Sequence, residues 1–196
     1  MARAATAFGD CADWPRVETW AERLSQVGIV APVTFVAQGP GVTTGGYDDE
    51  IVERRRVPSR QRSWHDFLNM LVWATFPTAK IALHRRQQLA VARARALNPD
   101  APRRDRGGDA LAMLDEGGVL SLGEHRLLFG HALYEHLVVG ERDAPAFLVP
   151  LRTADRTSDW NALVAHADAA LSALLADPTT FASPTDLPRA KLADLA

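Results

Sequence analysis

The fold is decided by one stretch of the sequence, Ser63-Trp-His-Asp-Phe-Leu-Asn-Met-Leu-Val-Trp-Ala-Thr-Phe-Pro-Thr-Ala-Lys80. Ser63, followed three residues later by Asp66, has the form of a capping box with Asp in place of the usual Glu, and it predicts the start of a helix. Pro77 cannot continue the interior of a helix, so we expect the first helix to end near residue 75 and a second to run to about residue 97. Asp66 is the only charged side chain before Lys80, which predicts that the first helix is buried and central.

Three polar side chains share one side of this first helix. At 100° per residue, His65, Asp66 and Asn69 fall on one arc of about 100°. His65 and Asn69 are four residues apart, and Asp66 and Asn69 are three apart, so these side chains can act together. Since buried polar groups need hydrogen-bond partners, the arc is a candidate catalytic site.

Length and composition indicate one ordinary globular domain. The chain has 196 residues, of which 47% are hydrophobic and 23% charged, and these fractions exclude a wholly disordered protein. We expect an α+β fold, dominated by helices and with a small sheet, in a single domain that covers residues 1–177. The tail, residues 178–196, contains three prolines and is expected to be irregular.

The sheet is expected to include a β-hairpin over residues 109–122. Two apolar runs there flank the turn signal Glu116-Gly-Gly118. Ser121-Leu-Gly-Glu124 is a capping box and predicts that the next helix covers residues 124–139. Residues 47–57 are expected to be extended, because they have a polar start, a basic end and a proline directly after them.

A second candidate group lies in the hairpin and the helix that follows it. His131 and Glu135 stand four residues apart on the predicted helix, so both can reach one metal ion, or the carboxylate can orient the imidazole. Asp115 lies on one face of the first hairpin strand. The sequence leaves open a structural interpretation, in which the His–carboxylate pairs are mutual hydrogen-bond partners that fix the packing of buried helices.

Three blocks of the sequence resemble one known family. The block from Trp64 to Lys80 resembles the pattern Trp-His-Asp, Phe-Asn-x-Leu-Val-Trp and Phe-Pro-x-x-Lys of a bacterial family, domain of unknown function 3025 (DUF3025), with Leu68 in the place of the family's first Phe. Residues 109–118 and 128–135 are similar to its second and third blocks. The resemblance groups the three blocks into one site, and it implies no activity, cofactor or mechanism.

The first functional interpretation is a hydrolase-like enzyme. His65 or His131 would act as the general base, because imidazole titrates near neutral pH. Asp66, Asp115 and Glu135 would orient that base or bind a divalent metal ion. Whether such an ion is present, and whether the protein is an enzyme at all, is open at the level of the sequence.

The distribution of charge supplies both a substrate class and an alternative function. The segment from Glu53 to Arg106 contains thirteen basic and four acidic residues, a net charge of +9 in a chain whose total is −2. In the enzyme interpretation Lys80, Arg104 and Arg106 would hold a phosphate-bearing substrate. In the alternative, the Arg-rich residues 54–106 form a non-catalytic module that binds a protein or, weakly and at low salt, a nucleic acid. Internal pairing of the arginines with acidic residues would remove that alternative's support.

The remaining features predict where the protein works. Cys11 is the only cysteine, which excludes a disulfide framework and a zinc finger. The first eight residues lack the apolar core of a signal peptide, and no apolar run reaches the roughly 18 residues needed to span a bilayer. We therefore expect a cytoplasmic protein with no membrane partner.

Overall fold

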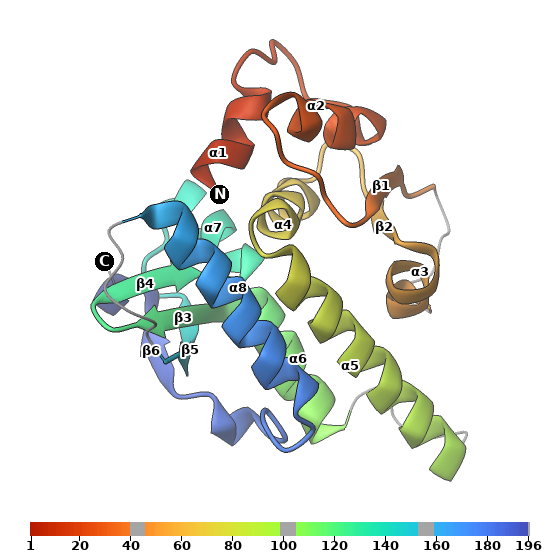
Figure 1. Ribbon diagram of the computed structural model, residues 1–196, viewed down its shortest axis with the longest axis vertical. Helices are drawn as coiled ribbons and strands as arrows, with labels where there is room; N and C mark the ends of the chain where they lie inside the picture. The colour runs from red at the N-terminus through yellow and green to blue at the C-terminus, as the bar shows by residue number, and fades with distance from the viewer. Residues whose placement is uncertain (40–45, 99–104, 153–158, 196) are drawn as a thin grey trace.

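The computed structural model describes residues 1–39, 46–98, 105–152 and 159–195 (Figure 1). This part of the chain consists of helices and two small sheets, so the predicted helix-dominated α+β fold is confirmed. In chain order the elements are α1 (Ala2–Ala5), α2 (Trp20–Gln26), β1 (Thr34–Ala37), α3 (Tyr47–Arg54), β2 (Arg56–Ser59), α4 (Trp64–Thr75), α5 (Pro77–Leu97), α6 (Arg106–Gly117), β3 (Gly118–Leu122), β4 (His125–Leu128), α7 (His131–Val138), β5 (Pro145–Pro150), α8 (Trp160–Ala176) and β6 (Arg189–Lys191).

The two sheets lie in different parts of the molecule. Strands β1 and β2 form a parallel pair beside α3, whereas the larger sheet has the order β4-β3-β5-β6, with β3 and β5 parallel and the other pairs antiparallel. Helices α5, α6 and α8 pack with the larger sheet into one hydrophobic cluster (Figure 1). The N-terminal segment, α2, β1, β2 and α4 form a second cluster, and Tyr134 of α7 packs against both.

The predicted break between α4 and α5 is confirmed. The Ser63 hydroxyl accepts a hydrogen bond from the Asp66 N–H at 3.3 Å and caps α4. Pro77 is the first residue of α5, where its missing N–H costs nothing. The two N–H groups that follow, on Thr78 and Ala79, donate to the buried carboxylate of Asp168 on α8 at 3.1 and 2.7 Å. The start of α5 is therefore fixed by a cap that comes from a distant helix.

The prediction that residues 47–57 are extended is wrong for most of the segment. Residues Tyr47–Arg54 form helix α3, and only β2 at the end is extended. Three acidic residues in the first turn of α3 stabilise a helix N-terminus, and Glu50 pairs with Arg54 one turn later. The order of the charges in this segment, acidic first and basic last, is thus the signal of a helix rather than of a strand.

The predicted hairpin at residues 109–122 is also wrong in its first half. Asp105 caps helix α6 by accepting from the Gly108 N–H at 2.7 Å, and the helix continues to Gly117. Its buried residues, Ala110, Leu111 and Leu114, have helical rather than alternating spacing. The Gly-Gly pair ends α6 and starts β3, and it forms no hairpin turn.

The hairpin of this region is formed by β3 and β4 instead. Gly123 has φ of +58° and makes the turn between these strands, so Ser121 lies in β3 and caps no helix. The predicted helix 124–139 is correspondingly shorter and begins at His131, after Gly130. In the C-terminal segment, which was expected to be irregular, residues Arg189–Lys191 form β6 against β5. In the described ranges no helix is long and apolar enough to cross a membrane, and the cytoplasmic location stays a prediction.

A glycine contact joins α6 to α7 and generates the first testable prediction. A Cβ atom on Gly130 would lie 2.5 Å from the Glu116 carbonyl oxygen and equally close to the backbone of Gly117. Gly130 has an ordinary φ of −66°, so the close approach and not the conformation requires glycine. We expect Gly130→Ala to lower the free energy of unfolding by about 1–3 kcal/mol in urea titrations, because the backbones must separate.

Gly9→Ala is the matched control for this substitution. Gly9 also has φ of −68°, and the nearest atom to an added Cβ is 3.7 Å away, which is an ordinary contact. Its free energy of unfolding should stay within about 0.5 kcal/mol of the unsubstituted protein. Equal effects of the two alanines would contradict the contact.

Candidate functional site

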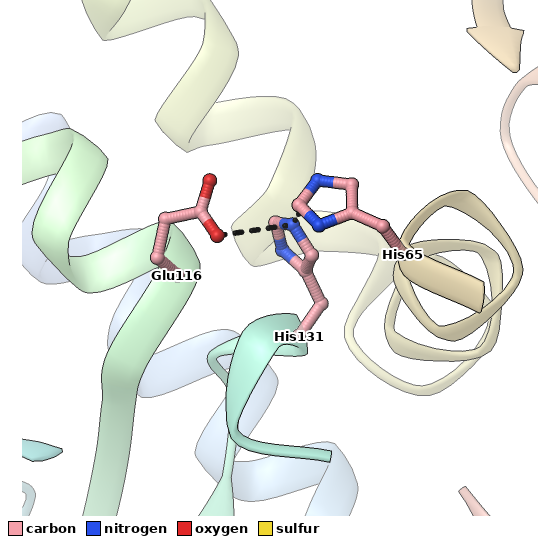
Figure 2. A group of neighbouring side chains, drawn as sticks. All are labelled: His65, Glu116 and His131. Atoms are coloured by element: carbon pink, nitrogen blue, oxygen red, sulfur yellow. Dashed lines mark hydrogen bonds and ion pairs between the residues drawn. The ribbon is translucent and has the colours of Figure 1, made fainter. Parts of the chain in front are cut away.

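Three side chains from three helices converge at one point (Figure 2). His65 lies in the first turn of α4, Glu116 in the last turn of α6, and His131 is the first residue of α7. The Nε2 atoms of the two histidines are 3.0 Å apart, and a Glu116 carboxylate oxygen lies 3.5 Å from His131 Nε2. One donor atom from each of the three residues lies within 4.8 Å of the other two.

These spacings match the ligand shell of a metal ion. Two atoms that each lie about 2.0–2.1 Å from a tetrahedral zinc are about 3.3–3.4 Å from one another. The His65–His131 and His131–Glu116 separations, 3.0 and 3.5 Å, bracket that value. Two histidines and one glutamate also form a ligand set of the kind that leaves the fourth position of a catalytic zinc open. The three residues are therefore a candidate metal site.

The environment of His131 favours its neutral form. Burial is the main cause that lowers its pKa to about 4, and the positive charge of Lys80 and the neighbouring His65 act in the same direction against the attraction of Asp115. A histidine must be neutral to bind a metal, so His131 is ready to do so at pH 7. Its Nδ1 atom is buried and makes no hydrogen bond of good geometry to any described residue.

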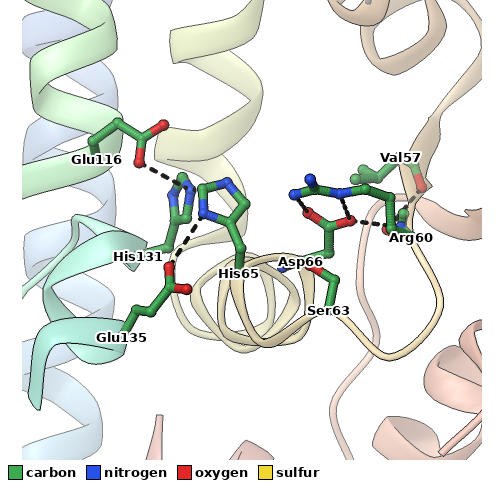
Figure 3. Close-up of polar contacts among 9 residues, drawn as sticks. Val57, Arg60, Ser63, His65, Asp66, Glu116, His131 and Glu135 are labelled. Carbon is green, nitrogen blue, oxygen red and sulfur yellow. Dashed lines mark hydrogen bonds and ion pairs between the residues drawn. The ribbon is translucent and has the colours of Figure 1, made fainter. Parts of the chain in front are cut away.

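Glu135 supports the second histidine. Its carboxylate lies 3.5 Å from His65 Nδ1 (Figure 3), whereas the other ring nitrogen of His65, Nε2, contacts His131. A carboxylate in that place attracts the N–H of Nδ1 and so favours the tautomer with the lone pair on Nε2, as in the carboxylate–histidine–metal arrangement. The structure therefore brings together His65, His131 and Glu135 of the predicted residues, and adds Glu116.

Asp115, Asn69 and Lys80 form a separate buried group next to this cluster. The Lys80 ammonium is fully buried and donates to Asp115 at 2.5 Å and to Asn69 at 2.8 Å. It also lies 5.4 Å from the centre of the Trp73 ring. Burial raises the pKa of Asp115, but Lys80, with His131 and His84, outweighs burial and holds that pKa well below its usual range. Lys80 neutralises Asp115 inside the protein and has no exposed surface with which to hold a substrate.

Asp66 points away from the histidines. Its carboxylate accepts two hydrogen bonds from the Arg60 guanidinium, at 2.9 Å each, and one from the Arg60 backbone N–H (Figure 3). Arg106 donates to Ser183 at 2.9 Å, and Arg104 falls outside the described residues. Of the predicted residues, Asp66 and Arg106 thus have other partners in the structure.

A second histidine–carboxylate pair was missed by the sequence analysis. His84 of α5 is 2% exposed; its Nδ1 lies 2.9 Å from Asp48 of α3, and its ring stacks on Trp73. Tyr47 lies nearby, and burial, together with the charges of three carboxylates, raises the pKa of its phenol. No local spacing links α3 to α5, because the pair is 36 residues apart and the α3 segment was expected to be a strand.

Many of these groups line one large cleft, but Lys80, Glu135 and Arg106 are not part of its lining. It has a volume of about 1410 Å³ and is lined by α3, α4, α5, α6 and the start of α7, including His65, Asp115, Glu116 and His131. His84, Asp48 and Asn69 also belong to its wall. The candidate metal site thus opens onto a space large enough for a substrate.

Four of the arginines at residues 54–62 are paired with carboxylates. Glu50 binds both Arg54 and Arg56, while Asp66 binds Arg60 and Asp13 binds Arg62. The arginine side chains are still about half exposed or more. This pairing is the internal arrangement that weakens the case for a nucleic-acid or protein-binding module, and that alternative stays a prediction.

Comparison with known proteins finds a family match over just under half of the chain. Residues 33–127 match the family described as "Protein of unknown function (DUF3025)", which confirms the resemblance stated from the sequence. The matched range contains His65 and Glu116, while His131 and Glu135 follow it. No curated protein and no solved structure matches the chain.

The buried ion pair gives a prediction about stability. Asp115→Asn leaves the Lys80 ammonium buried without a counter-charge, and we expect it to lower the free energy of unfolding by about 3–5 kcal/mol in urea. The double variant Lys80→Met with Asp115→Asn should regain most of this loss, because it also removes the uncompensated charge. Asp143→Asn, which removes the exposed partner of Lys191, is the control and should leave the transition midpoint unchanged. Strictly additive single effects would show that the pair contributes no coupling energy.

The low pKa of His131 gives a prediction about pH. Below pH 6.5 the unfolded chain binds a proton at this histidine, but the folded protein does not until about pH 4. Stability is therefore fully present above pH 6.5 and is lost as the pH falls towards 4, by roughly 3 kcal/mol from this group. Urea titrations in the presence of chelator should show a shallower pH dependence for His131→Gln than for the unsubstituted protein. A parallel dependence in the two proteins would contradict the assignment.

Proposed function

We propose that this chain, with its DUF3025-like residues 33–127, is a metal-dependent hydrolase that acts on a phosphate-bearing substrate. His65, His131 and Glu116 would hold one divalent cation at the wall of the cleft. The observation that carries the proposal is the convergence of two imidazole nitrogens and a carboxylate oxygen from three helices within 4.8 Å.

The donor set favours zinc over magnesium or calcium. Imidazole nitrogen suits zinc, whereas magnesium and calcium prefer sites made of oxygen ligands alone. Asp115 lies next to Glu116 in the chain, but Lys80 already neutralises its carboxylate. The described residues therefore support one metal ion rather than two. Zinc in such a site would polarise the substrate and lower the pKa of a water molecule.

The chain's own residues supply positioning around that ion. The Glu135 carboxylate attracts the N–H of His65 Nδ1 and fixes the orientation of the ring. Burial keeps His131 neutral, so the ligand does not depend on a high pH. The cleft wall excludes water from one side of the cluster, because His131 is 2% exposed.

Arg60 is the residue that we expect to contact the phosphate. It lines the same cleft, and its guanidinium has five N–H donors, of which Asp66 takes two. The other three donors stay available in a side chain that is 58% exposed. The Asp66 carboxylate thus holds the guanidinium in place while it presents donors that match phosphate oxygens. Arg60 takes the role predicted for Lys80, Arg104 and Arg106.

Metal binding tests the first part of the proposal. Protein stripped with a chelator is titrated with zinc chloride in a calorimeter, and we expect one zinc ion per chain. His65→Gln and His131→Gln should each weaken binding by more than about 100-fold, and Glu135→Gln, which removes a supporting group, by about 10–100-fold. His125→Gln, which removes a histidine outside the cluster, is the control. Unchanged affinity in the His65 and His131 variants would refute the site.

Hydrolysis tests the second part. The zinc-loaded protein is assayed with bis(p-nitrophenyl) phosphate, p-nitrophenyl phosphate and p-nitrophenyl acetate. We expect turnover of a phosphate ester that is lost in chelator, restored by zinc and absent in His131→Gln. Arg60→Gln should raise KM for the phosphate ester with little change in zinc affinity. Turnover of the acetate alone would contradict the substrate class, and no turnover of any ester by the zinc-loaded protein would contradict the enzyme.

A further inference from the structure

A second pocket of the molecule shares no lining residue with the cleft. It has a volume of about 460 Å³ and lies between the N-terminal segment and the first turn of α4. Its walls include Phe8 and Trp14 from the N-terminal segment, and Trp64 and Phe67 from α4. Pockets for small ligands start at about 300 Å³, so this volume suits a small molecule rather than a folded partner.

The aromatic rings of the pocket meet nearly at right angles. The centres of the Trp14 and Trp64 rings are 4.9 Å apart, with an angle of 82° between the planes. Phe67 lies at 79° to Trp64 and at 62° to Trp14, with centre distances of 6.0 and 5.9 Å. The three rings pack edge to face against one another, and Phe67 also contacts Phe8 and Trp20. The aromatic pocket is open to the surface at Trp64, which is 50% exposed.

The edge of this pocket carries an ion pair between Asp13 and Arg62. Asp13 is the only charged residue that lines the pocket. One Asp13 carboxylate oxygen accepts from the backbone N–H of Trp14 at 2.7 Å, and the other accepts from the Arg62 guanidinium at 3.2 Å, so the carboxylate is fixed at the edge of the aromatic walls. An aromatic face is itself negative and attracts a cation that has lost its water. The aromatic side chains of the walls and the Asp13 carboxylate at the edge therefore both favour a positively charged ligand over a neutral or negative one.

We propose that this pocket binds the quaternary ammonium group of a small molecule. The methyl groups of such an ion pack against aromatic faces, its charge interacts with the π-electrons and with Asp13, and it has no N–H that would need an acceptor. A primary ammonium is strongly hydrated and would find too few acceptors among these walls. The site does not depend on the metal cluster, because the two share no residue.

A matched pair of probes tests the proposal. Choline and 3,3-dimethylbutan-1-ol have the same shape, and only choline carries a charge. Each is titrated into the full chain in chelator, with binding followed by tryptophan fluorescence and calorimetry. We expect choline to bind roughly ten- to thirtyfold more tightly than the alcohol. Equal affinities would show a merely apolar pocket and overturn the proposal, as would no binding of choline.

Variants locate the binding site. Trp64→Leu keeps an apolar side chain but removes a π-face, and should abolish the preference for choline. Trp160→Leu, which alters a tryptophan of similar exposure on α8, should retain it. Arg62→Gln removes the cation that competes for Asp13 and should tighten choline binding, without touching the packing of the walls. Weaker binding in the Arg62 variant would overturn the role of Asp13, even if Trp64→Leu fails to fold.

The source of the ammonium group is decided by a third ligand. A short peptide with a trimethylated lysine carries the same head group on a protein chain. We expect it to bind no more tightly than choline, because the proposed recognition involves the head group alone. Binding more than tenfold tighter than choline would assign the pocket to a modified protein tail and overturn the small-molecule proposal.

Discussion

The backbones of Gly117 and Gly130 lie in direct contact, and the site depends on that contact. Both the Phe129 and the Gly130 N–H donate to the Gly118 carbonyl, at 2.9 and 2.8 Å, so the end of α6, the start of β3 and the start of α7 are held together. The next residue after Gly130 is His131, and the residue before Gly117 is Glu116. Because Gly117 and Gly130 have no Cβ atom, their backbones approach closely, and the neighbouring residues Glu116 and His131 come to lie next to one another.

A second constraint is the buried charge of Lys80. An ammonium without solvent contact requires a carboxylate and further acceptors, and Asp115 and Asn69 supply them from α6 and α4. This requirement explains one of the three residues in the polar arc on a helix that is otherwise apolar. Asn69 belongs to the arc because it accepts from Lys80, and Asp66 belongs to it because it binds Arg60. Only His65 of the arc is left for the metal cluster.

Local signals in the sequence were sufficient where one physical cause acts alone. The capping hydroxyl of Ser63 marks the start of α4, and Pro77 marks the start of α5. Both boundaries were predicted. The Gly117–Gly118 pair was misassigned because two glycines are consistent with a hairpin turn and with a close backbone contact, and only the tertiary structure decides between them. Glu116 was therefore placed in a turn, and its approach to His131 could not be predicted. His65, His131 and Glu135 were identified because each needs only helical spacing to be recognised.

The arrangement of the ring nitrogens in the cluster bears on the proposed cation site. If Glu135 holds the Nδ1 proton of His65, the Nε2 lone pair of that ring faces His131. Burial keeps His131 from taking up a second proton near neutral pH, so the two rings share at most one proton between their Nε2 atoms. The Glu116 carboxylate adds a third electron-rich atom at 3.5 Å. His131 is buried, whereas the side chains of His65 and Glu116 are 34% and 51% exposed, so water reaches one side of the cluster. In the proposed site, a divalent cation between the three groups would offset their mutual repulsion more fully than a single shared proton can.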